Sequence, residues 1–190
     1  MHTERQVQIL DLSIKLIDNN GIQGFTIKNL SKEIGISEPA IYRHFESKTA
    51  ILVAILDNFK EMVLKMYSQF TDSDSSAIGN IQSVFTKMLD VFSAQPSIIS
   101  VIFSEEIFKN EVVLKNKIVE IQNFHQTKIE DIIEKGQEAN NIRNDIDKTT
   151  LALIYMGAFR LLVKRWDLNG SNFDLKSEGE KLISSFKLFI

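Results

Sequence analysis

Apolar residues recur along most of this chain at intervals of three and four, and polar or glycine-containing breaks separate the runs. This spacing is typical of amphipathic helices, and no segment alternates as a half-buried strand would. The pattern predicts an all-α protein, with helices over Glu4–Asn20, Ile27–Ile34, Glu38–His44, Lys48 toward Phe70, Ile78–Ser93, Ser97 to about Asn110, Glu111–Ala139, Asp147–Trp166 and Ser177–Phe189. Only two prolines and eight glycines occur in 190 residues, which agrees with long helices.

Recognisable helix-ending, loop and turn signals separate these predicted helices. The apolar stripe of the first helix consists of Val7, Leu10, Ile14 and Ile17. It stops at Asn19-Asn20-Gly21, a strong helix-ending signal. The polar run from Thr71 to Ser76 predicts a loop, and the segment from Asn140 to Asn144 predicts a turn.

The segment from Phe25 to Lys48 predicts two short helices joined by a tight turn. Thr26 stands where its hydroxyl can cap the first helix. The apolar face of that helix consists of Ile27, Leu30 and Ile34. Gly35 follows where a helix end favours a left-handed residue. This is the layout of a helix-turn-helix, which places one helix in the major groove of DNA.

The second helix of this pair has its own signals. Ser37 is an expected N-cap, and Pro39 falls in the first turn, where a missing N–H costs nothing. Ile41 and Phe45 lie four residues apart and are expected to face inward. Ser47 is the expected cap of the long helix that begins at Lys48.

The outward face of the second helix carries groups suited to DNA. At about 100° per residue, Pro39, Ala40 and Arg43 point away from the core, flanked by Tyr42 and His44. Arginine can reach guanine edges or phosphate, tyrosine and histidine can donate to phosphate, and alanine permits close approach. A purely structural helix pair is the alternative, because this geometry also occurs outside DNA binding.

From Arg5 to about Leu56 the sequence resembles the DNA-binding domain of the tetracycline-repressor (TetR) family of bacterial regulators. The residues that carry the resemblance are Gly21, Gly24, Thr26, Ile27, Leu30, Ile34, Gly35, Ile36, Ser37, Ile41, Tyr42, Phe45, Lys48 and Leu52. The tract Ile41 to Leu52 is especially similar. Ser31 departs from the alanine that the family often has, and Glu38 adds an acid to the expected DNA-facing region.

The resemblance implies a helix-turn-helix domain over residues 1–47 and a helical regulatory and dimerisation domain over residues 48–190. The expected DNA-binding residues are Thr26, Lys28, Ser37, Glu38, Pro39, Ala40, Tyr42, Arg43, His44 and Lys48. The operator is expected to be a pseudo-palindrome in double-stranded DNA, because a twofold dimer presents two such helices.

The second domain is rich in phenylalanine and methionine, and the family usually binds an apolar or amphipathic ligand there. The expected pocket consists of Phe59, Met62, Met66, Phe85, Met88, Phe92, Phe103, Gln122, His125, Tyr155 and Phe159. For any single one of the phenylalanines and methionines, an ordinary helical core is the favoured explanation. His125 is also compatible with an exposed or hydrogen-bonded histidine, and Tyr155 and Arg160 with positions at a dimer seam.

An apolar C-terminus predicts a homodimer, because such a surface is unfavourable in water. The family resemblance implies that the terminal helices of two copies pair in a four-helix bundle, and the expected interface residues are Leu161, Leu182, Phe186 and Phe189.

Charge and composition narrow the possible functions. The net charge of −3 gives no general attraction to DNA, so local placement of Lys28, Arg43, His44 and Lys48 must supply it. The absence of cysteine excludes disulfides and fits the bacterial cytoplasm. No apolar run of about 18 residues and no signal peptide is present, so no membrane association is expected. No metal-ligand, nucleophile–base or phosphate-loop motif occurs, so we expect no metal, no cofactor and no enzymatic activity.

The sequence therefore predicts a DNA-binding transcriptional regulator, a repressor that a small hydrophobic or amphipathic ligand releases from its operator. One alternative is a DNA-bound adaptor that a protein partner regulates. Another is a ligand-binding or interaction protein that no longer binds DNA.

Overall fold

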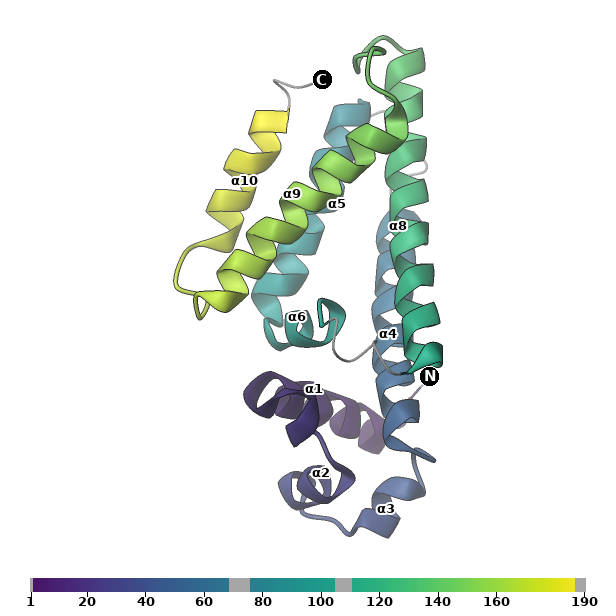
Figure 1. Cartoon of the computed structure of the whole chain (residues 1–190), viewed down its shortest axis with the longest axis vertical. Helices are drawn as coiled ribbons and strands as arrows, with labels where there is room; N and C mark the ends of the chain where they lie inside the picture. Colours follow the sequence, from purple (N-terminus) through teal and green to yellow (C-terminus); the bar gives the residue numbers. More distant parts are fainter. Residues whose placement is uncertain (1, 69–75, 105–110, 187–190) are drawn as a thin grey trace. The chain divides into compact units, whose positions relative to one another are not determined.

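The structure is a computed structural model that describes residues 2–68, 76–104 and 111–186. These residues form helices and connecting turns, with no strand among them. The helices are α1 (Glu4–Gly24), α2 (Ile27–Ile34), α3 (Glu38–Tyr42), α4 (Lys48–Ser68), α5 (Ala77–Ala94), α6 (Ser97–Ile102), α8 (Val112–Glu138), α9 (Lys148–Leu168) and α10 (Leu175–Phe186) (Figure 1). The all-α prediction is confirmed. None of these helices has both the length and the apolar character that a bilayer span requires.

The chain divides into two compact units. The first unit consists of Met1–Glu61 and Ser97–Glu120, and the second of Met62–Pro96 and Ile121–Ile190. Helices α4 and α8 each begin in the first unit and end in the second. The division into domains at residue 48 concerns the roles of the segments and stays a prediction.

In the first unit, α1 packs against α2 and α6. Leu10, Ile14 and Ile17 are buried as the apolar stripe predicted, but Val7 is exposed, so the stripe begins one turn later than expected. The predicted stop at Asn19-Asn20-Gly21 corresponds to a break at Gly21, whose φ of 65° is not helical, and α1 continues beyond this kink to Gly24. The left-handed φ explains the glycine at position 21, because other residues rarely adopt it.

Polar contacts join the other elements of the first unit. Ser100 of α6 donates a hydrogen bond of 2.5 Å to Asp18 of α1. The start of α8 is held to α4 by an ion pair of Lys117 with Asp57 at 2.5 Å. A second ion pair joins Lys60 to Glu120 at 2.7 Å.

In the second unit, α10 packs against α5 and α9, and the three helices lie side by side in Figure 1. Gly179 makes the contact of α10 with α5 close, because an added Cβ would lie 2.3 Å from a methyl carbon of Leu89. Ser76 caps α5 by accepting a hydrogen bond from the backbone N–H of Gly79. The rest of the predicted loop from Thr71, with Phe70, lies outside the described residues.

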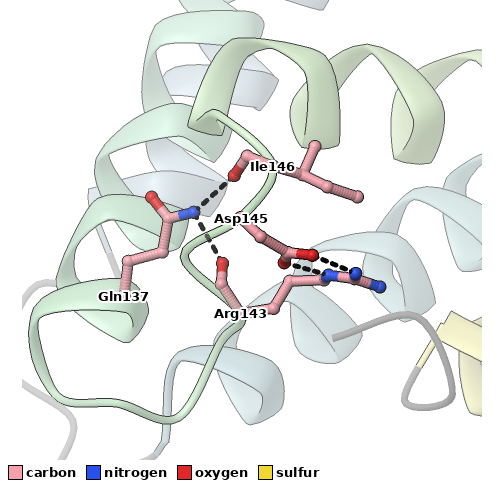
Figure 2. Close-up of polar contacts among 4 residues, drawn as sticks. All are labelled: Gln137, Arg143, Asp145 and Ile146. Atoms are coloured by element: carbon pink, nitrogen blue, oxygen red, sulfur yellow. Dashed lines mark hydrogen bonds and ion pairs between the residues drawn. The ribbon is translucent and has the colours of Figure 1, made fainter.

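The turn between α8 and α9 is organised by side chains (Figure 2). The Gln137 amide donates to the carbonyls of Arg143 and Ile146, both at 2.8 Å. Arg143 makes a two-pronged ion pair with Asp145, which lowers the pKa of that carboxyl. Asp147 then caps α9 by accepting from the backbone N–H of Thr150 at 2.9 Å. The turn predicted from Asn140 to Asn144 is confirmed.

Two helices are predicted to extend into residues that the structure does not describe. The helix expected from Ser97 to about Asn110 ends at Ile102 in the structure, and residues 105–110 lie outside the description. The helix expected to reach Phe189 is described as far as Phe186.

Candidate DNA-binding surface and regulatory core

The helix pair α2–α3 forms as the local signals predict. Thr26 accepts a hydrogen bond of 3.1 Å from the backbone N–H of Asn29, which caps α2. Gly35 closes the helix at φ 77°, in the left-handed region. Ser31 is buried, and its hydroxyl donates to the carbonyl of Lys28, so the departure from alanine leaves no polar atom unpaired.

The helix α3 is anchored from its inner side. Ile41 and Phe45 are buried, as expected from their spacing. Ser37 is the N-cap residue, but its hydroxyl makes no capping hydrogen bond, so that part of the prediction is wrong. Pro39 lies in the first turn, where it needs no partner for a backbone N–H.

The helix predicted over Glu38–His44 ends at Tyr42, with Arg43 as its C-cap, and the outer side of α3 and the two residues after it carry the predicted DNA contacts. Glu38, Pro39, Tyr42 and Arg43 are exposed, and Ala40 and His44 are half-buried. Lys28, Thr26 and Ser37 are exposed on and around α2. The structure therefore leaves these side chains available for DNA, and their contacts with it stay a prediction.

A contact between distant segments that no local sequence pattern predicts holds the residues just after α3. Gln6 of α1 accepts a hydrogen bond from the backbone N–H of Thr3, which completes a capping box. The side-chain amide of Gln6 also donates a hydrogen bond of 3.4 Å to the carbonyl of His44. Gln6 therefore joins the start of α1 to the turn that directly follows α3.

Lys48 has a structural contact besides its predicted role at phosphate. Its ammonium donates a hydrogen bond of 3.1 Å to the carbonyl of Ile22 and lies 5.2 Å from the ring centre of Phe25. Burial lowers the pKa of Lys48. Ser47 accepts from the backbone N–H of Ala50 and caps α4, as predicted. The lysine therefore ties the kinked end of α1 to the start of α4.

An aromatic cluster occupies the second unit and includes several residues of the predicted pocket. We define it as Phe85, Phe92, Tyr155, Phe159 and Phe186. Phe85 lies 4.9 Å from Phe159 and 6.0 Å from Phe186, between ring centres. Phe92 lies 6.3 Å from Phe159, and Tyr155 lies 4.4 Å from Phe186 in an edge-on arrangement. The rings come from α5, α9 and α10.

A polar contact in the second unit joins α4 to α8. The Tyr67 hydroxyl and His125 Nδ1 share a hydrogen bond of 2.7 Å. Burial raises the pKa of Tyr67 and lowers the pKa of His125 to about 4. The histidine is therefore neutral at pH 7. It is hydrogen-bonded, as one of the interpretations of the sequence expected.

The remaining pocket residues are dispersed. Met66 and Met88 are buried and Met62 is half-buried in the second unit. Gln122 of α8 is exposed, and its place in a pocket stays a prediction. The other two, Phe59 and Phe103, belong to the first unit.

The predicted dimer residues separate into two kinds. Leu161 is 64% exposed and Leu182 is half-buried. Phe186 is only 5% exposed, because its ring packs against Tyr155 and Phe85 of its own chain. Phe186 was predicted to lie in the dimer interface, and the structure places its ring in the core of its own chain instead. Phe189 lies outside the described residues.

No group of three or more metal-ligating side chains occurs in residues 2–68, 76–104 and 111–186.

A capped helix pair that exposes proline and tyrosine on its second member, with an exposed arginine directly after it, has the layout of a helix-turn-helix DNA-binding domain. Residues 9–55 match the family described as bacterial regulatory proteins, tetR family. Residues 78–189 match the C-terminal region of the MAATS-type transcriptional repressors. The chain belongs to the tetR family of bacterial regulatory proteins. It is a DNA-binding transcriptional regulator of the repressor type, and the matched families are regulators rather than enzymes.

Known proteins share this fold at low identity. The FadR regulator of Bacillus subtilis, in complex with stearoyl-CoA, has a TM-score of 0.83 at 19% identity, covering 97% of this chain and 98% of that one. The ketosteroid regulator KstR2 of Mycobacterium tuberculosis has a TM-score of 0.84 at 17% identity, covering 98% and 95%. The nucleoid occlusion factor SlmA of Haemophilus influenzae (strain PittGG) is 23% identical over 179 residues, covering 92% of this chain and 79% of that protein.

Proposed function

We propose that the protein is a dimeric repressor that a small hydrophobic or amphipathic molecule releases from its operator. Residues 1–47 read the DNA, and residues 48–190 dimerise and bind the effector. The observation that supports the DNA half most directly is the exposed side of α3, where Tyr42 and Arg43 stand free of the core. Two such helices, about 34–36 Å apart, enter successive major grooves of a pseudo-palindrome. This activity belongs to the bacterial cytoplasm and requires no cofactor.

The dimer proposal rests on the outer face of α9. Leu153, Ile154, Leu161 and Leu168 of this helix are 67%, 48%, 64% and 74% exposed. Gly157 lies between them along the helix, and an added Cβ there would meet no atom within 4 Å. Clustered exposed leucines are unfavourable in water, and a glycine among them allows a second helix to approach closely. A second copy of α9 is the occupant we propose, with Leu182 of α10 at its edge.

The effector proposal rests on the aromatic cluster. Its rings come from three helices, and the surrounding side chains Met88 and Val84 are apolar and buried. An effector that enters there is mainly apolar, because buried ions without a partner are costly. The similar fold of FadR, whose structure holds stearoyl-CoA, and of a ketosteroid regulator supports an effector of this class.

Regulation is then a shift between two states. The effector favours the state in which the spacing of the two α3 helices does not match successive major grooves. Helix α4 carries the change because it runs from one unit into the other. Effector binding and operator binding weaken each other by the same factor.

A protein-regulated DNA adaptor is the second candidate, and the similarity to SlmA supports it. One experiment separates the two. Protein purified from its host is bound to an operator fragment and studied by native mass spectrometry before and after addition of the host's small-molecule extract. Our proposal predicts a small ligand on the DNA-free dimer. A protein partner on the DNA-bound form, with no response to the extract, favours the adaptor.

A further inference from the structure

The side chain of Tyr155 presents an unusual chemical situation. The residue is 1% exposed, and its hydroxyl has no hydrogen-bond partner. Among the described residues, one other buried side-chain oxygen, Ser93 Oγ, shares this condition. Buried polar groups in folded proteins nearly always have a partner, so each exception calls for a physical explanation.

Tyr155 is the more informative of the two. A serine hydroxyl on a helix can turn about one bond and return to a backbone carbonyl of the preceding turn. A tyrosine hydroxyl is fixed at the end of a rigid ring, and the ring of Tyr155 is held edge-on by Phe186 at 4.4 Å. Its oxygen therefore cannot reach another partner without moving the ring.

The ring that carries this hydroxyl belongs to an apolar aromatic cluster. Phe186 contacts the Tyr155 ring, and Phe85 and Phe159 continue the cluster. Burial raises the pKa of Tyr155 to about 12, so the hydroxyl stays protonated at neutral pH. It can then donate one hydrogen bond and accept others.

The lysines of α9 and α10 are engaged in ion pairs, and α9 also carries Arg160 and Arg165. All four lysines within α9 and α10 form ion pairs: Lys148 with Glu134, Lys164 with Asp167, Lys176 with Asp90 and Lys181 with Glu178. A carboxylate brought to Tyr155 would lose its hydration among the rings of Phe186 and Phe85, where the neutral Tyr155 hydroxyl can donate only one hydrogen bond, which is unfavourable. An uncharged oxygen meets no such penalty.

We propose that the Tyr155 hydroxyl is the specificity-determining contact for the effector and hydrogen-bonds an uncharged oxygen, a carbonyl or a hydroxyl, on an otherwise apolar molecule. This inference rests on the proposed function, since it names the chemistry of the effector site. The orphaned hydroxyl thus makes binding of an oxygen-bearing effector more favourable than binding of a hydrocarbon or an acid.

The test compares Tyr155→Phe with the parent protein, and Tyr67→Phe serves as the matched control for stability. Both tyrosines are buried, but the Tyr67 hydroxyl is hydrogen-bonded to His125. Loss of a satisfied hydrogen bond should lower the Tm of Tyr67→Phe by about 2–4 °C. Tyr155→Phe should keep or raise the Tm of the unliganded protein. A fall equal to that of the control means that the hydroxyl already has a partner, which overturns the proposal.

Binding is measured by calorimetry with three probes of equal chain length: 2-dodecanone, 1-dodecanol and dodecanoate. The parent should bind the ketone and the alcohol more tightly than the acid, and Tyr155→Phe should weaken the two neutral probes about tenfold. Unchanged affinity in the variant, or a parent that prefers the acid or binds none of the three, overturns the proposal. Operator release by the host extract, measured on the parent in parallel, shows whether the proposed function stands when this inference fails.

Discussion

Replacing Leu161 by aspartate should convert the proposed dimer to monomer. Leu161 is 64% exposed on α9, and complete burial of a leucine stabilises by about 1.5–3 kcal/mol. Covering the exposed part in an interface therefore contributes about 1–2 kcal/mol per protomer. A twofold interface contains the residue twice, so the variant loses about 2–4 kcal/mol, or about 30- to 1,000-fold in dimer affinity. Desolvation of two carboxylates weakens the dimer further.

The assay is sedimentation velocity over a range of concentrations, with circular dichroism to confirm that each variant stays helical. Val113→Asp is the matched control, because Val113 is 55% exposed on α8, outside the proposed interface. The control should sediment as the parent does. The reasoning fails if Leu161→Asp keeps the dimer affinity of the parent, or if both variants lose it equally.

Two further predictions concern groups whose contacts the structure defines. Lys48→Ala should destabilise the protein by about 1 kcal/mol in urea unfolding, because the carbonyl of Ile22 loses its hydrogen-bond donor. The same variant should lower the salt dependence of DNA binding by about one unit of slope. Unchanged stability would mean that the hydrogen bond of Lys48 to Ile22 is absent in solution. For His125, burial lowers the pKa to about 4 from an unfolded value near 6.5. The folded state therefore binds fewer protons between these values, and stability falls as the pH falls. Between pH 7.5 and 5 the parent should lose about 2 kcal/mol that His125→Gln does not lose; equal pH profiles would show that the histidine titrates normally.

The helix-turn-helix was the part of the fold most predictable from sequence, because its signals are local. A cap at Thr26, a left-handed Gly35 and an apolar face of three residues lie within ten positions, and α2 has the predicted bounds. The same locality placed Ile41 inward and Arg43 outward, since both follow from one helical turn.

Contacts between distant segments could not be predicted in this way. The hydrogen bond from Lys48 to Ile22 and the pair of Tyr67 with His125 depend on how helices pack, which no local spacing encodes. Phe186 shows the same limit: an apolar face indicates burial, but not whether the cover comes from the same chain or from a second copy. The structure assigns this ring to its own chain and leaves Leu161 exposed instead.

The central claim is that α3 reads a specific DNA sequence, and selection from a library of genomic fragments tests it most directly. The parent protein and Arg43→Ala are used to enrich fragments in parallel, and the bound sequences are compared. Our account predicts that the parent enriches a pseudo-palindrome with half-sites about 10 base pairs apart, or a multiple of that spacing. Arg43→Ala should bind it about 1–3 kcal/mol more weakly while keeping its fold. Enrichment of no common sequence by the parent, or of the same sequence with equal affinity by Arg43→Ala, would contradict the account.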